Sequence, residues 1–475
     1  MYKYLFPYEK IPYGSRIVIY GAGDLGQDYL LQMEMTHYCS VVAIADRNYQ
    51  KYPPMTALLV APADIHKYEY DYVVIALRMQ AAYPEILRVL HEQGIEDNRI
   101  VCIFERNDEE ISIFGVKENE RENDDSCAYD ITKQSIAILS TGGFGDMVIQ
   151  KRFVTEMIKY APECRIDLYN IKAISFLKHL YTDTKNVNRV VDDLGYRYRA
   201  KKGRYTLSLT IEACHFIRVD NWSSEKALNI FPEEFVQRLD ILKKVSDEEC
   251  IGINTPAYLT MTRRRFKGLN AYSGFNYDGA FNINDKKVSI PLDDSFSENF
   301  AEYRFGKYIT VNYGNGDSES SEGIAKSWSK EAFETVIQDF KKKYPDIKVV
   351  QVGGKSAYEL KGSDQYVLGE DFRLVLHILK NSMLHLDIEG GLVHIASQLG
   401  TKCVVLFGPT VPDYYGYEQN INIRIGDCRE CWGLYSNVNR CARGMKKPIC
   451  MRRITPKMVS AKIDEYMEVI GCQKK

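Results

Sequence analysis

The residues best suited to chemistry lie in one segment, residues 386–410, which reads LDIEGGLVHIASQLGTKCVVLFGPT. An apolar run ends at Glu389-Gly390-Gly391, a helix-like stretch carrying His394 follows, and a second apolar run ends at Gly408-Pro409-Thr410. Paired glycines at a strand-to-helix turn let backbone N–H groups approach an anion closely, and the helix dipole favours negative charge there. The segment therefore predicts half of a diphosphate-binding site.

Two further side chains could serve a reaction at such a site. Asp146 follows the strand-like run SIAILS and a loop with three glycines, so its carboxylate could accept a proton from a hydroxyl group. Aspartate is equally a favoured helix N-cap. Lys326, in Lys-Ser-Trp-Ser before a helix expected from residue 330, could contact a phosphate as a point charge, although a solvated lysine would look the same.

A third motif lies near the N-terminus. Gly21-Ala-Gly23-Asp-Leu-Gly26 follows a strand-like run and opens a helix, and Asp46 ends the next strand 20 residues after Gly26. This is the dinucleotide-binding fingerprint in its expected context, with an acidic residue suited to ribose hydroxyls. The region lacks a Tyr-x-x-x-Lys pair for redox or epimerase chemistry, and a tight turn that binds nothing is the alternative. The ligand of this motif stays unknown.

Four cysteines are clustered near the C-terminus, at Cys428, Cys431, Cys441 and Cys450. Together they could supply four thiolates to a tetrahedral structural site for zinc or iron. Four reduced thiols, or two disulfides, are the alternatives.

Composition narrows the class of protein. The chain has 475 residues, 45% of them hydrophobic and 27% charged, with a formal net charge of −2. This balance argues against a nucleic-acid partner, which usually needs a broadly basic face. No apolar run has the roughly 18 residues of a membrane span, and the first residues lack an apolar signal core, so we expect a cytoplasmic protein.

Short β-branched runs alternate with helical patterns through three α/β regions. We expect a small Rossmann-like domain at residues 1–115, a charged linker at 116–134, one lobe at 135–302 and a second lobe at 303–475. Ligands of such sheets bind at the carboxyl ends of the strands.

In this order the motifs resemble those of glycosyltransferase family 9, the bacterial lipopolysaccharide heptosyltransferases, over about residues 135–460. The resemblance implies a GT-B fold of two facing Rossmann-like lobes, with the nucleotide-sugar bound mainly by the second. It matches Asp146 to the catalytic base and Lys326 to the phosphate-contacting lysine. The residues that it matches to the donor site are Glu389, Gly390, Gly391, Leu392, His394, Gly408, Pro409 and Thr410.

The chain departs from the family at Glu389-Gly390-Gly391, where heptosyltransferases usually carry Asp-Thr/Ser-Gly. In the family the acidic residue points toward the donor sugar, so the longer glutamate leaves the donor open between ADP-heptose and another nucleotide-sugar.

The predicted function is therefore an inverting, metal-independent glycosyltransferase. It would act on a hydroxyl of a surface glycan, a lipopolysaccharide intermediate at the membrane, or a protein. An NAD-dependent sugar-nucleotide oxidoreductase or epimerase, acting through the first domain, is one alternative. A non-catalytic nucleotide-sugar-binding module is the other. The oligomeric state is not predicted.

Overall fold

The computed structural model describes residues 6–52, 54–77, 82–102, 133–170, 173–191, 205–212, 216–249, 264–277, 279–284, 287–313, 325–426 and 448–472, with the single positions 261, 428, 431, 441 and 445. These residues belong to two compact units, of which the first contains residues 6–102. The predicted linker at 116–134 falls almost entirely outside the described residues, and the predicted domain boundaries stay predictions.

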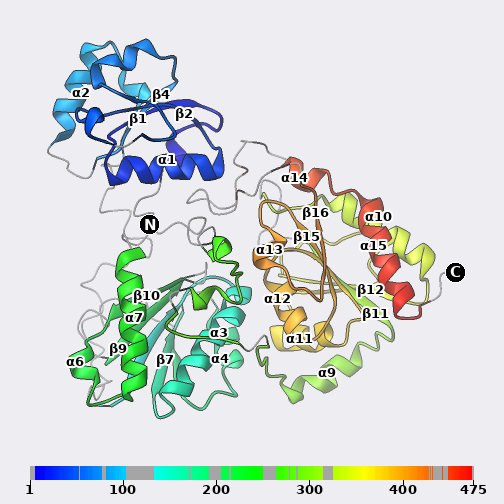
Figure 1. Ribbon diagram of the computed structural model, residues 1–475. Coiled ribbons are helices and arrows are strands. Elements are labelled where there is room, and N and C mark those ends of the chain that lie inside the picture. The colour runs from blue at the N-terminus through cyan, green and yellow to red at the C-terminus, as the bar shows by residue number, and fades with distance from the viewer. Residues whose placement is uncertain are drawn as a thin grey trace. The chain divides into compact units, whose positions relative to one another are not determined.

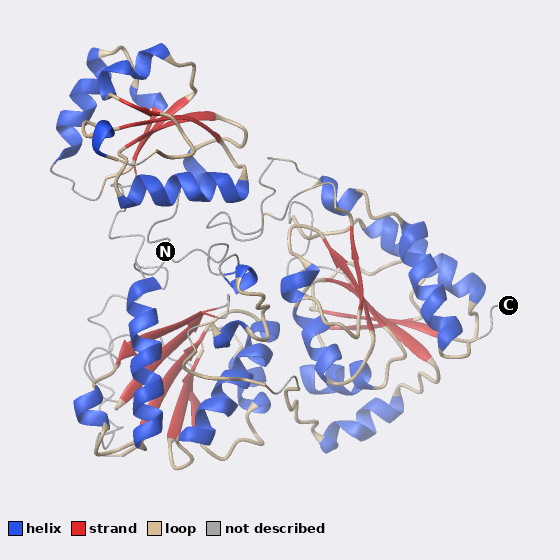
Figure 2. Ribbon diagram, viewed as in Figure 1, coloured by secondary structure: helices blue, strands red, loops and turns tan. Residues whose placement is uncertain are grey.

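The first unit is a small parallel α/β sheet with the strand order β3-β2-β1-β4-β5. Its strands are β1 (Arg16–Tyr20), β2 (Ser40–Ala45), β3 (Leu59–Val60), β4 (Tyr72–Ile75) and β5 (Ile100–Cys102), and its helices are α1 (Asp24–Thr36) and α2 (Tyr83–Glu92). The central strands β1 and β4 are rich in β-branched residues and are buried after their first residue, as expected for strands covered on both faces. Helices flank this sheet in Figure 2.

The second unit contains two α/β lobes. The acceptor-side lobe, as the sequence predicts it, has a sheet with the order β10-β9-β6-β7-β8, in which only the edge pair β9–β10 is antiparallel. Its strands are β6 (Ser135–Ser140), β7 (Arg165–Tyr169), β8 (Val187–Val191), β9 (Leu207–Glu212) and β10 (Phe216–Asn221). Its helices are α3 (Phe144–Tyr160), α4 (Ile174–Leu180), α6 (Ser224–Ala227) and α7 (Glu233–Glu249).

The C-terminal lobe has six parallel strands in the order β13-β12-β11-β14-β15-β16. They are β11 (Tyr308–Asn312), β12 (Lys348–Gly353), β13 (Gln365–Leu368), β14 (His385–Ile388), β15 (Cys403–Phe407) and β16 (Ile421–Arg424). The helices are α9 (Ser297–Glu302), α10 (Lys330–Lys343), α11 (Phe372–Lys380), α12 (Gly391–Gln398), α13 (Pro412–Tyr415), α14 (Ile449–Arg452) and α15 (Pro456–Val469). Helices α10 and α15 lie on one side of this sheet, and α11 and α12 on the other (Figure 1).

A doubly wound sheet changes direction at its central strands, and ligands bind in the crevice outside the carboxyl ends of the strands at that point. In the C-terminal lobe the change falls between β11 and β14, and the segments that follow these two strands carry Lys326 and Glu389. The predicted fold class, a GT-B arrangement of Rossmann-like lobes preceded by a small Rossmann-like domain, is confirmed by these three sheets. None of the described helices is both long and apolar enough to cross a bilayer.

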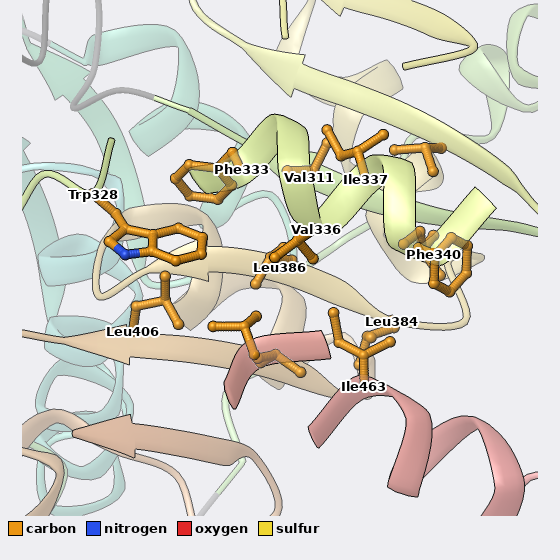
Figure 3. Close-up of a cluster of buried hydrophobic side chains, with 14 of the residues drawn as sticks. Val311, Trp328, Phe333, Val336, Ile337, Phe340, Leu384, Leu386, Leu406 and Ile463 are labelled. Carbon is orange, nitrogen blue, oxygen red and sulfur yellow. The ribbon is translucent and has the colours of Figure 1, made fainter. Parts of the chain in front are cut away.

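The core of the C-terminal lobe also anchors the segment that carries Lys326. Figure 3 shows Trp328 beside Phe333 of α10 and Leu406 of β15 in one apolar cluster. The Trp328 indole is 3% exposed and donates its Nε1–H to the Ile454 carbonyl at 2.9 Å. Ser329 caps α10 by accepting the Ala332 N–H. Packing and capping thus fix the chain within three residues of the lysine.

Candidate functional site

Asp146 lies in the first turn of α3, directly after the glycine loop that ends β6. Its carboxylate accepts the Gly143 N–H at 2.9 Å, as expected of an acidic side chain at a helix start. Gly142 has φ +96°, and a Cβ at this position would lie 2.6 Å from Asp146 Oδ2. The loop therefore needs glycine here both for its backbone conformation and for the room that the carboxylate occupies.

The pKa of Asp146 is raised from its ordinary value to about 6, mainly because burial disfavours the carboxylate, and Glu389 adds to this effect. The Gly143 hydrogen bond, His394 and Lys326 oppose it. An aspartate that served only as a helix cap would not be affected by Glu389, His394 or Lys326. Asp146 is thus a cap that also belongs to a charged cluster contributed by the other lobe.

Helices α3 and α12 pack against each other with their backbones unusually close. A Cβ on Gly145 would lie 2.5 Å from His394 Cδ2 and 3.0 Å from Gly391 Cα. A Cβ on Gly391 would lie 3.3 Å from the Gly145 nitrogen. These two glycines allow the start of α3 to contact the glycine loop that precedes α12.

Lys326 and Glu389 form a buried ion pair, with 2.7 Å between Lys326 Nζ and Glu389 Oε2. The two side chains are 11% and 5% exposed. Burial alone would raise the pKa of Glu389, but Lys326 and His394 outweigh it and hold that pKa at about 2. Glu389 is therefore a firmly ionised carboxylate at neutral pH.

His394 connects this pair to two tyrosines that the sequence did not single out. Its Nε2 lies 3.7 Å from Glu389 Oε1, and its Nδ1 lies 3.1 Å from Tyr272 Oη and 3.2 Å from Tyr417 Oη. Tyr272 donates its hydroxyl hydrogen to the Tyr415 carbonyl at 3.0 Å. The Tyr417 hydroxyl remains as a donor to Nδ1, which favours the imidazole tautomer protonated at Nε2.

Tyr272 belongs to the segment before the C-terminal lobe, and its place at His394 depends on contacts remote in sequence. Arg152 of α3 donates to the Tyr272 carbonyl, and the Ala271 N–H donates to the Tyr414 carbonyl at 2.8 Å. No motif in the sequence surrounds Tyr272, so sequence reasoning had no signal for it.

The remaining donor-site predictions fall at the ends of β14 and β15. Gly390 is the N-cap of α12, which places Gly391 and Leu392 in its first turn. The Thr410 side chain, three residues after β15, is fully buried, and its hydroxyl has no hydrogen-bond partner among the residues that the structure describes. A Cβ on Gly408 would lie 2.4 Å from Met451 Sδ, so this glycine serves packing.

The neighbouring Pro409 carbonyl accepts the Cys431 N–H at 3.2 Å. This hydrogen bond connects the segment after β15 to Cys431 of the cysteine cluster.

In the first unit, the fingerprint residues hold the turn together. Gly21 has φ +118°, and a Cβ on Gly26 would lie 1.8 Å from the Gly21 carbonyl oxygen. Asp46 accepts the Ala22 N–H at 2.8 Å through one carboxylate oxygen and the Asn48 N–H at 2.7 Å through the other. Around Gly23 there is open space. The glycines and Asp46 are thus accounted for structurally, and nucleotide binding by this unit stays a prediction.

Cys428, Cys441 and Cys450 are free thiols. The pKa of Cys450 is raised to about 11, mainly by burial and also by Cys428 and Cys441, so these thiols lie within electrostatic reach of one another. Within the described part of the chain, however, no three His, Cys, Asp or Glu side chains are grouped as metal ligands. The four-thiolate site therefore stays a prediction.

Residues 13–101 match the family model described as C2185-like, N-terminal. Similar solved structures include the E. coli ADP-heptose lipopolysaccharide heptosyltransferase II, with 14% identity over 71% of this chain and 99% of the other, at a TM-score of 0.43.

A glycosyltransferase family 9 protein from Veillonella parvula has 13% identity over 72% and 100% of the two chains, at a TM-score of 0.45. The iron-containing dodecameric glycosyltransferase TibC from enterotoxigenic E. coli has 12% identity over 71% and 77%, at a TM-score of 0.42. The search of curated proteins gives no match.

The close approach of α3 and α12 predicts that Gly145→Ala destabilises the second unit. The new methyl group would overlap the His394 ring, at a cost of about 1–3 kcal/mol in unfolding free energy. Gly143→Ala is the matched control, because its Cβ would meet only Asp146 Oδ2, at 3.9 Å, and should cost less than about 1 kcal/mol. Urea unfolding of both variants checks this, and equal stabilities would contradict the tight contact.

The two site carboxylates should respond oppositely to neutralisation. Because folding raises the pKa of Asp146, its favourable contribution is present at low pH and is lost as the pH rises through about 6. Asp146→Asn should therefore raise the unfolding free energy at about pH 8 by about 1–3 kcal/mol, and by less at about pH 5.

Glu389→Gln should instead lower the unfolding free energy at about pH 8 by about 3–5 kcal/mol, since it leaves Lys326 buried without its partner charge. The contribution of Glu389 would be lost only as the pH falls through about 2, because its folded pKa is depressed. Thermal unfolding at both pH values checks the pair. A destabilised Asp146→Asn protein at about pH 8 would show that this carboxylate is mainly a cap.

Proposed function

We propose that this protein is a glycosyltransferase that moves a sugar, heptose or another, from a nucleoside-diphosphate sugar to an acceptor hydroxyl. One observation carries the proposal: the start of α3, with Asp146, packs directly against the start of α12, beside which Lys326, Glu389 and His394 are grouped. A carboxylate can activate the acceptor hydroxyl by taking its proton. A glycine loop with a lysine can bind the diphosphate of the donor.

In the proposed reaction, Asp146 takes the proton of the acceptor hydroxyl as the oxygen attacks the anomeric carbon. The bond from that carbon to the diphosphate oxygen breaks, the nucleoside diphosphate leaves with both bonding electrons, and the configuration inverts. A pKa of about 6 leaves Asp146 ionised at neutral pH yet makes it a stronger base than an ordinary aspartate.

The leaving diphosphate would be met by groups of the protein rather than by a catalytic metal ion. Lys326 supplies the charge, and the N–H groups at the start of α12, near Gly390 and Gly391, point to the same end of the sheet. The buried, unpaired Thr410 hydroxyl is a further donor that a phosphate or sugar oxygen could satisfy. Such preorganised donors are commonly the largest catalytic contribution.

The proposed acceptor is defined less narrowly than the donor. A surface glycan, a lipopolysaccharide intermediate at the membrane, or a protein would each offer the hydroxyl that Asp146 requires, and the reaction would take place in the cytoplasm. The nucleotide base and the acceptor can be found by screening ADP-, GDP- and UDP-sugars by thermal shift, because a ligand that binds only the folded state raises its melting temperature.

Two substitutions separate the roles of the two lobes. Asp146→Asn should lower turnover by about 100-fold or more with little change in nucleoside-diphosphate affinity, because it removes the base and not the donor site. Lys326→Ala should weaken nucleoside-diphosphate binding by about 1.5–3 kcal/mol. Lys330→Ala, four residues later in α10, is the control and should bind normally. Near-normal turnover of Asp146→Asn would reject the proposed mechanism.

We also propose that the four cysteines hold one structural zinc or iron ion. Their number and the electrostatic coupling of Cys450 to Cys428 and Cys441 support this. Purified protein should then contain about one equivalent of metal, and Cys431→Ser should lose both the metal and thermal stability. Chelation should act slowly, through unfolding. A metal-free protein of full stability and activity would leave four ordinary thiols.

A further inference from the structure

Lys326 is the cation that the proposed donor site would use. The Lys326 ammonium is in contact with Glu389 at 2.7 Å, in surroundings that leave the two side chains 11% and 5% exposed. An ammonium group has three N–H donors, so a phosphate must either share Lys326 with Glu389 or take it away. In both cases Glu389 loses part of the charge that stabilises it, and a new anion arrives close by.

A buried carboxylate in that position must be compensated, because an unpaired charge in the interior is costly. The group next to Glu389 is His394, whose Nε2 lies 3.7 Å from Glu389 Oε1. The other charged or titratable groups near the pair include Asp146 and Arg152 of α3, Tyr272 and Tyr417, and the Arg152 guanidinium is already bound to the Tyr272 carbonyl. Asp146 is itself acidic, and the pKa values of both tyrosines are raised by burial, so neither tyrosine supplies charge at neutral pH.

The surroundings of His394 suit both of its protonation states. In the neutral ring, Nδ1 can accept the hydrogen of the Tyr417 hydroxyl, at 3.2 Å. The Tyr272 hydroxyl gives its own hydrogen to the Tyr415 carbonyl and so presents a lone pair to Nδ1 at 3.1 Å. A charged imidazolium could instead donate Nδ1–H to Tyr272 and face the Glu389 carboxylate with Nε2–H, and the Tyr417 hydroxyl would then turn its hydrogen away from Nδ1.

We propose that the Glu389–His394 pair binds one proton from the solvent when a nucleoside diphosphate occupies the site and draws Lys326 away from Glu389. This deepens the proposed function and rests on it. The proton is shared by the two residues as one coupled unit. In turnover, the added positive charge would already be in place when the bond to the anomeric carbon breaks and negative charge develops on the diphosphate.

Proton uptake on binding can be measured without knowing the acceptor. The probe is the tightest binder among ADP, GDP and UDP. Calorimetric titrations at about pH 8 in buffers of different ionisation enthalpy give the number of protons taken up, and at this pH both the terminal phosphate and Asp146 are ionised beforehand. We expect uptake approaching one proton per nucleotide bound. Affinity should accordingly weaken by up to about tenfold per unit of rising pH.

Variants identify the proton acceptor. Glu389→Gln should reduce the uptake to near zero, whereas Asp146→Asn should retain it. Lys326→Met is a second, independent variant: without the lysine the pair should already hold its proton, so any remaining nucleotide binding should take up none. Melting temperatures measured alongside show that each variant is folded.

The outcomes separate this inference from the function on which it rests. Nucleotide binding without proton uptake in the wild-type protein would overturn the inference alone. Uptake that disappears in Asp146→Asn but persists in Glu389→Gln would overturn it too, by assigning the proton to the proposed base. Binding of none of the three nucleotides would overturn the proposed function and the inference together.

Discussion

The close contact between α3 and α12 is the constraint on which the candidate site depends. Two helix starts, each preceded by a glycine loop at the carboxyl end of a central strand, meet where Gly145 and Gly391 leave out their side chains. A larger residue at Gly145 would occupy the place of the His394 ring. Since this contact sets the distance between the two lobes' charged groups, the electrostatics of the site follow from packing.

Within that contact, charges of opposite sign balance one another at short range. Lys326 and Glu389 come from segments after different strands, and neither would be stable in the interior without the other. Their pairing leaves Asp146 as the carboxylate whose ionisation burial opposes, while Glu389 stays ionised. Two acidic groups in one cluster thereby acquire opposite pKa shifts, an arrangement typical of sites that divide proton transfer from charge stabilisation.

The apolar core of the C-terminal lobe holds in place the segment that carries Lys326. Trp328 is buried in the cluster formed by α10, α15 and the sheet, two residues from Lys326. The lysine is thus held on a segment that is fixed by packing at one end and by the Ser329 cap. An ammonium group on an ordered backbone loses less conformational freedom when it contacts a ligand.

The sequence by itself determined the three α/β sheets and the placement of the motifs, because β-branched runs and glycine turns are local signals for buried strands and strand-to-helix turns. It also identified Asp146, Lys326, Glu389 and His394 singly, the first two each with an ordinary alternative. The tertiary structure decided that these four side chains form one cluster. It also decided that Glu389 pairs with Lys326, and that Asp46 holds backbone N–H groups of its own turn.

Only the tertiary structure could bring in Tyr272 and Tyr417, which reach His394 from segments more than 20 residues away in sequence. Contacts of this kind depend on how separate elements pack, and no spacing or local propensity encodes them. The sequence therefore specified which groups were available for chemistry. Packing specified their partners, and with them their protonation states, because a pKa depends on burial and neighbouring charge rather than on residue type alone.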